Sequence, residues 1–403
     1  MAEASPVLRG PWTLGINNKA NERAIPEGSV RDSVNYDPAA DGVLRARTGY
    51  QKVMTGSAIR GALAVGTHIL IADGTLLVDF NAETNSYAVL KTIAGSGRFA
   101  GAVLNDELFF CTENEALRYK NGALRRWGVP TVTNQPVPSV GTGALIAGTY
   151  QCAATFVDAY GDEGGTTNAI IITVPEGSSL IFPAMTPPAG GRVRLYVSAV
   201  SGGTLYLQYE GTSGYVCSSV DDATARLETQ FLHEPTPGAR IAAHNGVLLT
   251  ADDSVLHMTM PLRPHLRSAI KGWFQFPAPV DMVISGDGGV FVSSDKTYFL
   301  TDIESPAPIS RKVFDFGAVR GSETKGLRNE VMWMTRYGLA KSDGTGNAIL
   351  TSEANFVPEL ATSANSTLLE SNGNQLVVTT MQAVKGPNPL AASDTYDVEI
   401  VTP

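Results

Sequence analysis

The chain has 403 residues, of which 43% are hydrophobic and 17% charged, with a formal net charge of −9. This balance excludes an intrinsically disordered chain, and the lack of a Lys/Arg block argues against a basic face that grips nucleic-acid phosphates. The three cysteines, at positions 111, 152 and 217, cannot all pair and lack the Cys-x-x-Cys spacing of a structural zinc site. We also expect no signal peptide and no membrane-spanning segment.

Residues 1–55 form a polar arm with turn signals such as Asp41-Gly42. We expect an arm of this length not to hang free, and pairing with the last structural repeat is one way in which it could be fixed. Its aromatic and basic side chains belong to the residue types that anchor protein interfaces. The interface candidates are Trp12, Arg45, Arg47 and Tyr50. The alternative is that these side chains pack within their own subunit, and for Tyr50 this alternative is at least as strong.

After the arm, a short apolar run recurs several times, each time preceded by a polar turn. Six such runs, without the 3.6-residue spacing of helices, begin at residues 68, 107, 246, 289, 330 and 375, at intervals of 39, 139, 43, 41 and 45. Four intervals fit the roughly 40–45 residue period of a four-stranded propeller blade. Their nearly continuous apolar character is typical of strands covered on both faces. The runs are His68–Ala72, Glu107–Cys111, Gly246–Thr250, Gly289–Ser293, Glu330–Met334 and Gln375–Thr379.

The sequence therefore predicts an all-β fold, a six-bladed β-propeller. The alternative is a large β-sandwich or several stacked sheets, whose strands should alternate apolar and polar residues without a fixed period. The one long interval exceeds a period by about 100 residues, the size of a small domain. We predict an inserted immunoglobulin/fibronectin-III-like β-sandwich there. Its expected strands lie within Gly148–Val157, Asn168–Val174, Arg192–Val197 and Gly203–Tyr209, with a hairpin-like turn at Asp158–Gly164 joining the first two.

The predicted domains follow from these boundaries. Residues 1–55 are the arm, 56–129 blades one and two, 130–237 the inserted sandwich, and 238–403 blades three to six. The last strand, Tyr396–Val401, is expected to belong to the closing blade. Cys152 and Cys217 within the insert are expected to be buried thiols.

No pattern in the chain predicts catalytic residues, a metal site or a cofactor. Its five histidines are scattered, and each is interpreted as structural. Gly95–Gly101 has GxGxxxG spacing without a following helix, so we interpret it as a turn and not as a nucleotide-binding loop. Ser293–Phe299 resembles an Asp-box turn of sialidase-type propellers, but lacks its glycine and tryptophan. We predict that the protein is not an enzyme. A glycan-acting enzyme, which needs two facing carboxylates, is an alternative.

Several short sequence motifs of the arm and the insert resemble those of the tail nozzle (tail tubular) proteins of short-tailed bacteriophages. In those proteins a similar N-terminal segment leads into a β-propeller. Three segments of the insert resemble the sandwich module inside those proteins. The matching segments are Gly15–Asn18, Ile25–Arg31, Val34–Asp37 and Asp41–Tyr50 in the arm, and Gly148–Tyr150, Phe156–Asp158 and Gly161–Gly164 in the insert.

This resemblance implies a structural virion protein of the tail, assembled in the host cytoplasm. Such nozzles are rings, commonly of six copies, which lie below the portal and adaptor, contact tail fibre or tip proteins and form part of the DNA-ejection channel. The net charge of −9 suits a lumen through which DNA passes without specific binding. The alternative function is a receptor- or glycan-binding propeller at the tail tip.

Overall fold

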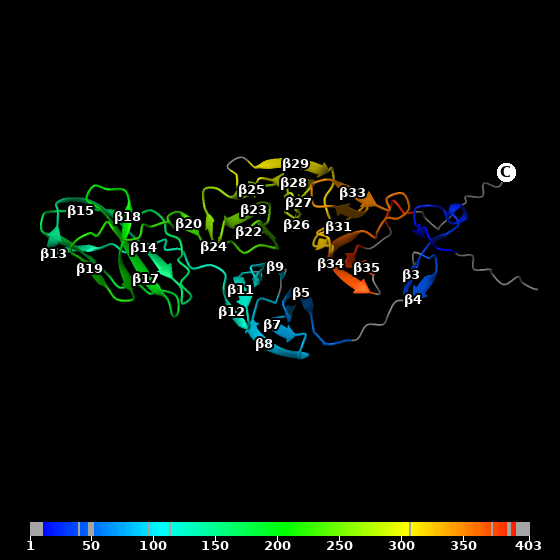
Figure 1. The fold of residues 1–403 in the computed structure, drawn as a ribbon, viewed down its shortest axis with the longest axis horizontal. Coiled ribbons are helices and arrows are strands. Elements are labelled where there is room, and N and C mark those ends of the chain that lie inside the picture. The colour runs from blue at the N-terminus through cyan, green and yellow to red at the C-terminus, as the bar shows by residue number, and fades with distance from the viewer. Residues whose placement is uncertain are drawn as a thin grey trace, which may run out of the picture. The chain divides into compact units, whose positions relative to one another are not determined.

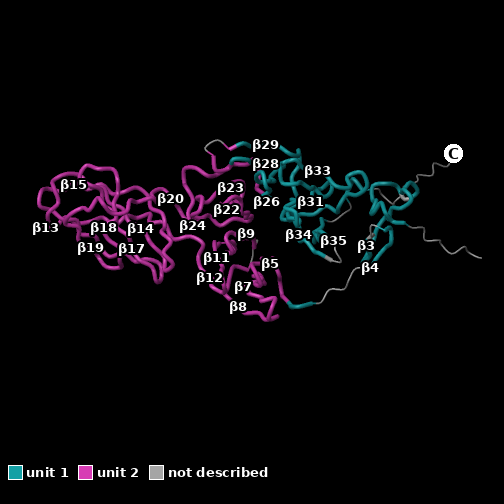
Figure 2. The backbone as a smooth tube through the Cα atoms, viewed as in Figure 1, with its two compact units in different colours: residues 1–55, 281–302, 309–403 teal, residues 56–280, 303–308 magenta. Residues whose placement is uncertain are grey.

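A computed structural model describes residues 11–38, 41–46, 52–95, 97, 99–112, 114–305, 308–371, 374–384 and 388–391 (Figure 1). Over these ranges the fold is all-β, as predicted, and the single helix is the 3-10 turn η1 (Glu22–Ala24). No helix in this part of the chain has the length and apolar character needed to cross a membrane. Figure 2 colours two compact units, one of residues 1–55, 281–302 and 309–403, the other of residues 56–280 and 303–308.

The unit of residues 56–280 contains three antiparallel meanders. Sheet 1 consists of β5 (Ile59–Val65), β6 (His68–Asp73), β7 (Leu76–Asn81) and β8 (Ser86–Thr92). Sheet 2 consists of β9 (Ala100–Leu104), β10 (Glu107–Cys111), β11 (Ala116–Lys120) and β12 (Ala123–Arg126). Sheet 3 is built on β21 (Arg240–His244), β22 (Val247–Asp252) and β23 (Val255–Met260); β23 also pairs with β24 (Arg263–Ser268) and β25 (Trp273–Gln275), and β24 with β20 (Leu232–His233).

The other unit contains three further antiparallel sheets. Sheet 4 consists of β26 (Met282–Ser285), β27 (Val290–Ser293), β28 (Thr297–Thr301) and β29 (Ile309–Phe314). Sheet 5 consists of β30 (Thr324–Lys325), β31 (Val331–Thr335), β32 (Gly338–Ser342) and β33 (Ala348–Thr351). Sheet 6 is the pair β34 (Ala361–Ser371) and β35 (Asn374–Ala383). The predicted strand Tyr396–Val401 lies outside the described residues.

Five of the six apolar runs become the second strand of their sheets, namely β6, β10, β27, β31 and β35, and the sixth, β22, is the second strand of the β21–β22–β23 meander of sheet 3, which β20 precedes in the chain. The turns before them explain why these strands begin where they do. Asn105-Asp106 and Asn245-Gly246 have positive φ at both residues, the geometry of a two-residue type I′ hairpin turn. Asparagine, aspartate and glycine tolerate this conformation best.

Consecutive sheets of the 56–280 unit pack through buried side chains. Leu108 and Phe110 of β10 join a cluster with Leu70 and Leu77 of sheet 1. The next residues of the same strand, Phe109 and Cys111, face the opposite way, into a cluster with Ile241 and Leu248 of sheet 3. Strand β10 is therefore buried on both faces, which is the reason for its uninterrupted apolar run.

The same packing recurs in the other unit. Phe291 of sheet 4 and Trp333 of sheet 5 belong to one buried cluster, with ring centroids 5.1 Å apart. Met334, the neighbour of Trp333 on β31, faces a second cluster that includes Ala364 of sheet 6. Sheets 4, 5 and 6 are thus stacked in chain order by the alternating faces of β31.

The segment predicted as an insert, residues 130–237 and called the insert below, contains two sheets around one core. One sheet has the order β15 (Ile170–Val174), β14 (Gly148–Val157), β17 (Arg192–Ser198), β18 (Leu205–Gly211). The other has the order β13 (Ser139–Leu145), β16 (Ser178–Phe182), β19 (Tyr215–Cys217). Both contribute to a single buried cluster that contains Cys152 and Cys217. These cysteines, like Cys111, are buried and unpaired, as predicted for Cys152 and Cys217.

The two ends of the insert lie against each other. At Gly128, an added Cβ would lie 2.6 Å from the Cδ of Pro235. Within the insert, an added Cβ at Gly165 would lie 1.7 Å from the carbonyl oxygen of Leu232, close to the second end. Only glycine leaves room for these backbones to approach so closely. The insert therefore leaves sheet 2 and returns towards sheet 3 at neighbouring points.

The arm is fixed to the far end of the chain rather than hanging free. Its elements are β1 (Gly15–Ile16), η1, β2 (Ser29–Val30), β3 (Tyr36–Pro38) and β4 (Leu44–Ala46), with β1 parallel to β2 and β3 antiparallel to β4. The side chain of Asn18 donates to the carbonyl of Val357 at 2.7 Å and accepts from its N–H at 2.9 Å. The backbone N–H of Asn18 also donates to the Asn355 carbonyl at 3.0 Å. Over the described residues the attachment is to the segment before β34, and no strand of the arm pairs with sheet 6 there.

Candidate functional site

A buried arginine lies where the insert meets sheet 2. Arg118 alternates along β11 with Leu117 and Tyr119, which enter the core between sheets 1 and 2, so its side chain takes the opposite face. Only 4% of that side chain is exposed. Its Nε donates to the Arg126 carbonyl at 3.1 Å, and its guanidinium donates to Asp162 of the insert. A buried guanidinium needs such partners, because an unpaired charge in the interior is very costly.

The carboxylates come from the loop at residues 158–164. Asp158 Oδ1 accepts from the backbone N–H of Tyr160 and of Asp162, both at 2.9 Å, and Gly161 has a φ of 92°. This tight turn projects Asp162 towards Arg118 and leaves Asp158 Oδ2 at 3.6 Å from the same guanidinium. Arg125 of β12 lies over the Tyr160 ring at 4.3 Å. The loop is thus held to sheet 2 by charge, hydrogen bonding and ring contact.

Asp162 and His265 face each other across this junction, with Oδ1 and Nδ1 3.8 Å apart. Burial raises the pKa of Asp162, but the Arg118 hydrogen bond and the nearby charges outweigh burial and the pKa is lowered. Burial lowers the pKa of His265, and the opposing charge of Asp162 does not reverse this. At neutral pH the site therefore pairs an aspartate anion with a neutral imidazole.

A second carboxylate, Glu163, points into the insert. It accepts from the hydroxyls of Thr155 at 2.5 Å and Tyr196 at 2.6 Å, and from Arg194 at 2.7 Å. Burial, followed by the charge of Glu163, raises the pKa of Tyr196, so its hydroxyl stays protonated and donates. Arg194 also donates to Glu210 at 2.6 Å.

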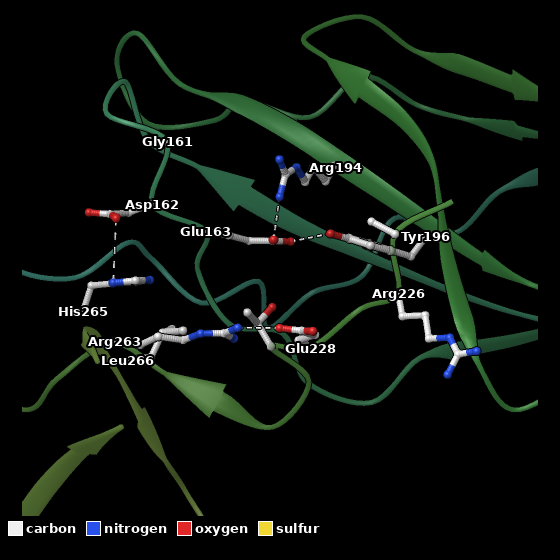
Figure 3. Close-up of a pocket in the computed structure, with 12 residues that line it drawn as sticks. Gly161, Asp162, Glu163, Arg194, Tyr196, Arg226, Glu228, Arg263, His265 and Leu266 are labelled. Carbon is white, nitrogen blue, oxygen red and sulfur yellow. Dashed lines mark hydrogen bonds and ion pairs between the residues drawn. The ribbon is translucent and has the colours of Figure 1, made fainter. Parts of the chain in front are cut away.

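These groups line a pocket of about 530 Å³ between the insert and sheet 3. Figure 3 shows Glu163 bonded to Arg194 and Tyr196, Asp162 facing His265, and Arg263 paired with Glu228. The four walls are the 161–163 loop, β17, the 225–229 segment that leads back to sheet 3, and β24. Among the described residues, no group of three histidine, cysteine or acidic side chains is arranged to hold a metal ion.

A separate polar cluster joins sheets 1 and 2. His68 Nδ1 lies 3.0 Å from both carboxylate oxygens of Asp79, and the Tyr119 hydroxyl donates to Asp79 Oδ2 at 2.7 Å. Burial and Asp79 raise the pKa of Tyr119. These three groups serve as hydrogen-bond partners for one another, which is the behaviour of a structural histidine.

Two of the four interface candidates are described. The backbone N–H of Trp12 donates to the Gly42 carbonyl at 2.7 Å, and its side chain is partly buried. The Arg45 side chain is 67% exposed and pairs with Asp41 at 2.5 Å. Arg47 and Tyr50 lie outside the described residues. The structure thus places Trp12 and Arg45 in the β3–β4 region of the arm. They are distant in sequence from the pocket residues and belong to a different compact unit.

Sequence reasoning missed the pocket and the Arg118 junction. The 158–164 segment was interpreted only as a turn. An arginine between apolar residues on β11 was the available signal, because a charge in a strand buried on both faces requires a partner. The sequence does not identify that partner, which lies 44 residues further along the chain.

Comparison with known proteins finds no family model and no curated protein that matches this chain. Among solved structures, BBS1N in complex with ARL6DN is 12% identical, with 84% of this chain and 97% of that chain covered and a TM-score of 0.33. A streptogramin B lyase is 12% identical, with 75% of this chain and 86% of that chain covered and a TM-score of 0.31. The N-terminal domain of Nup159 is 10% identical, with 80% of this chain and 73% of that chain covered and a TM-score of 0.31. These TM-scores are too low to define the fold or the function of this chain.

Proposed function

We propose that the protein is a structural virion component, a subunit of the tail nozzle ring of a short-tailed phage that forms part of the DNA-ejection channel. The observation that carries the proposal is the role of the Gly15–Asn18 segment, on which the resemblance begins. Asn17 and Asn18 fix the arm: Asn17 Oδ1 accepts from Ala20 N–H at 2.9 Å, and Asn18 clamps Val357 from both sides. The segment that resembles the nozzle family thus holds the arm in place in this chain.

We further propose that the six sheets are the blades of one six-bladed propeller. Two features support this: the regular use of each apolar run as a second strand, and the packing of consecutive sheets face to face within each unit. The insert is proposed to be an immunoglobulin/fibronectin-III-like module. It has seven strands in sheets of four and three, the number found in a constant-type immunoglobulin domain.

A ring subunit needs a rigid body, because cyclic symmetry repeats one heterologous contact until the ring closes. Buried sheet-to-sheet packing supplies that rigidity, and the Arg118 junction holds the insert to the body. The arm, with Trp12 and Arg45, is the proposed donor of contacts to the neighbouring subunit. The remaining partners are the head-to-tail adaptor and the tail fibre or tip proteins, and the place of action is the virion tail. A net charge of −9 disfavours sticking of the passing DNA.

The test is native mass spectrometry and negative-stain imaging of the purified full chain, alone and with the phage adaptor protein. We expect a closed ring of one copy number, six, and no retention of duplex DNA at physiological salt. A chain that stays monomeric at every concentration, with and without adaptor, and is absent from purified virions would refute the proposal.

A matched pair of variants tests the arm as the subunit contact. Arg45→Glu and Lys312→Glu each reverse an exposed basic side chain, 67% and 50% exposed, that pairs with a nearby aspartate. Surface pairs of this kind contribute only about 0–1 kcal/mol to stability, so both subunits should fold. We expect Arg45→Glu to shift the ring towards monomers and Lys312→Glu to leave it intact. Equal behaviour of the two variants would remove the arm from the interface.

A further inference from the structure

The pocket beside the 158–164 loop has no role in the sheet packing or in the proposed ring contact. Its volume of about 530 Å³ falls within the range of small-molecule sites, about 300–1,000 Å³. Its lining is balanced in charge. The carboxylates are Asp162, Glu163 and Glu228, and the guanidinium groups are Arg194, Arg226 and Arg263.

Most of these charges are already paired. Arg194 holds Glu163 and Glu210, Arg263 holds Glu228, and Asp162 holds Arg118 behind the wall. An anionic ligand would therefore meet three carboxylates, and a cationic ligand three guanidinium groups. Except at the exposed Arg226, whose guanidinium lies 5.9 Å from the Tyr206 ring centroid, either ligand would have to displace an existing partner and lose that pair's stabilisation. A neutral ligand avoids this cost.

The paired groups still have hydrogen-bonding capacity. An ionised carboxylate offers about four lone-pair sites and a guanidinium five N–H donors. The contacts of Arg263 and Glu228 with each other use only part of theirs. Asp162 Oδ1 and His265 Nδ1 are 3.8 Å apart, too far for a direct hydrogen bond, and this is the kind of gap that a bridging oxygen fills.

A hydroxyl group matches that gap. It can donate to the Asp162 carboxylate and accept from His265, or donate to both, because a neutral imidazole can present either a donor or an acceptor. A second hydroxyl close by can accept from Arg263 and donate to Glu228. The wall beside them contains Thr229, a buried residue whose hydroxyl has no hydrogen-bond partner among the described residues. Several adjacent hydroxyls on one neutral ligand would use these groups together.

We propose that this pocket binds a neutral saccharide, with one hydroxyl bridging Asp162 and His265 and a neighbouring hydroxyl held by Arg263 and Glu228. The site lies between the insert and β24, so the bound sugar contacts both modules. This inference goes beyond the ring proposal and does not depend on it. Loss of ring assembly would leave saccharide binding unchanged, so the two proposals fail separately.

The experiment begins with the purified full chain on an array of neutral and acidic oligosaccharides. The strongest neutral binder is then measured by isothermal titration calorimetry, and inorganic phosphate and a sialylated oligosaccharide are titrated as anionic probes. We expect binding of a neutral oligosaccharide and none of the anions. Absence of any neutral binder, or binding confined to anions, would overturn the proposal.

Two variants and one control locate the site. His265→Phe removes one side of the hydroxyl bridge and should weaken binding about tenfold, the equivalent of one hydrogen bond. Glu228→Gln changes an exposed rim residue, so it tests the pocket even if His265→Phe fails to fold. Glu234→Gln is the control, because Glu234 also pairs with an arginine, Arg126 at 2.7 Å, but does not line this pocket. Equal weakening by Glu228→Gln and Glu234→Gln, or no weakening by Glu228→Gln, would overturn the proposal.

Discussion

Replacing Arg118 with methionine should be among the most damaging single changes in the 56–280 unit. Methionine keeps much of the aliphatic stem, so the lost element is the charge with its hydrogen bonds to Asp162 and to the Arg126 carbonyl. Removing one partner of a buried ion pair costs about 3–5 kcal/mol. Because the Asp162 side chain is 27% exposed, water compensates part of its lost pairing, and we expect the lower end, about 3 kcal/mol. For a unit of this size that corresponds to a fall in Tm of about 6–12 °C.

The matched control is Arg126→Met on the adjacent strand. The Arg126 side chain is 62% exposed and pairs with Glu234 at 2.7 Å, and its backbone carbonyl continues to accept from Arg118. An exposed pair contributes about 0–1 kcal/mol. Differential scanning calorimetry and urea unfolding of both variants give the comparison. The reasoning is refuted if Arg118→Met costs less than about 1 kcal/mol, or if the two variants are equally destabilised.

Three further predictions concern the arm, the thiols and pH. Asn18→Ala removes both hydrogen bonds to Val357, worth about 1–3 kcal/mol together, so limited proteolysis should cut the arm faster than in the wild type. The control is Lys19→Met, which removes one exposed bond from the Lys19 ammonium to the Glu353 carbonyl at 2.8 Å; equal cleavage rates of the two variants would contradict the role of Asn18. Native thiols should not react with a disulfide reagent at pH 8, and all three should react in guanidinium, because burial raises their pKa; rapid native labelling would be inconsistent with the structure. The values are about 12 for Cys111 and Cys152 and about 11 for Cys217. Burial holds the pKa of three histidines below the ordinary 6.5, so the unfolded chain takes up protons that the folded chain does not. The contribution of these histidines to the free energy of unfolding is therefore fully present above about pH 6.5 and is lost as the pH falls below it. The urea midpoints at pH 7.5, 6.5 and 5.5 should decrease in that order. A constant midpoint would refute this. The histidines are His233, His257 and His265.

The strands of the repeated sheets could be predicted because their signal is local. An apolar run such as Glu107–Cys111, preceded by a turn at Asn105-Asp106, specifies both the strand and its starting point. Local patterns also identified the four strands of one insert sheet, β14, β15, β17 and β18, with alternating apolar and polar residues in β14 and β17. They missed β13, β16 and β19 of the other sheet. β13 contains Gly141 and Gly143, which weaken a strand pattern, and β19 has only three residues.

The pocket and its charge network could not be predicted in the same way. The contacts that bring its walls together join residues that are distant in the chain, such as Arg118 with Asp162 and Asp162 with His265. No local period encodes which acidic loop faces which arginine, since this depends on how the insert is placed on sheets 2 and 3. The interface candidates Arg47 and Tyr50 stay predictions, because they lie outside the described residues.

Because Gly128 lies so close to Pro235, the insert could be removed without separating the points at which it joins sheets 2 and 3. Sheets 2 and 3 meet through Phe109 and Leu248 without any help from it, so a short peptide linker in place of residues 130–234 would preserve that contact. Recombination could then exchange one outer module for another while the underlying scaffold stays the same. Arg118 would remain buried after such an exchange, so every new module would need an acidic residue at the position that Asp162 holds now.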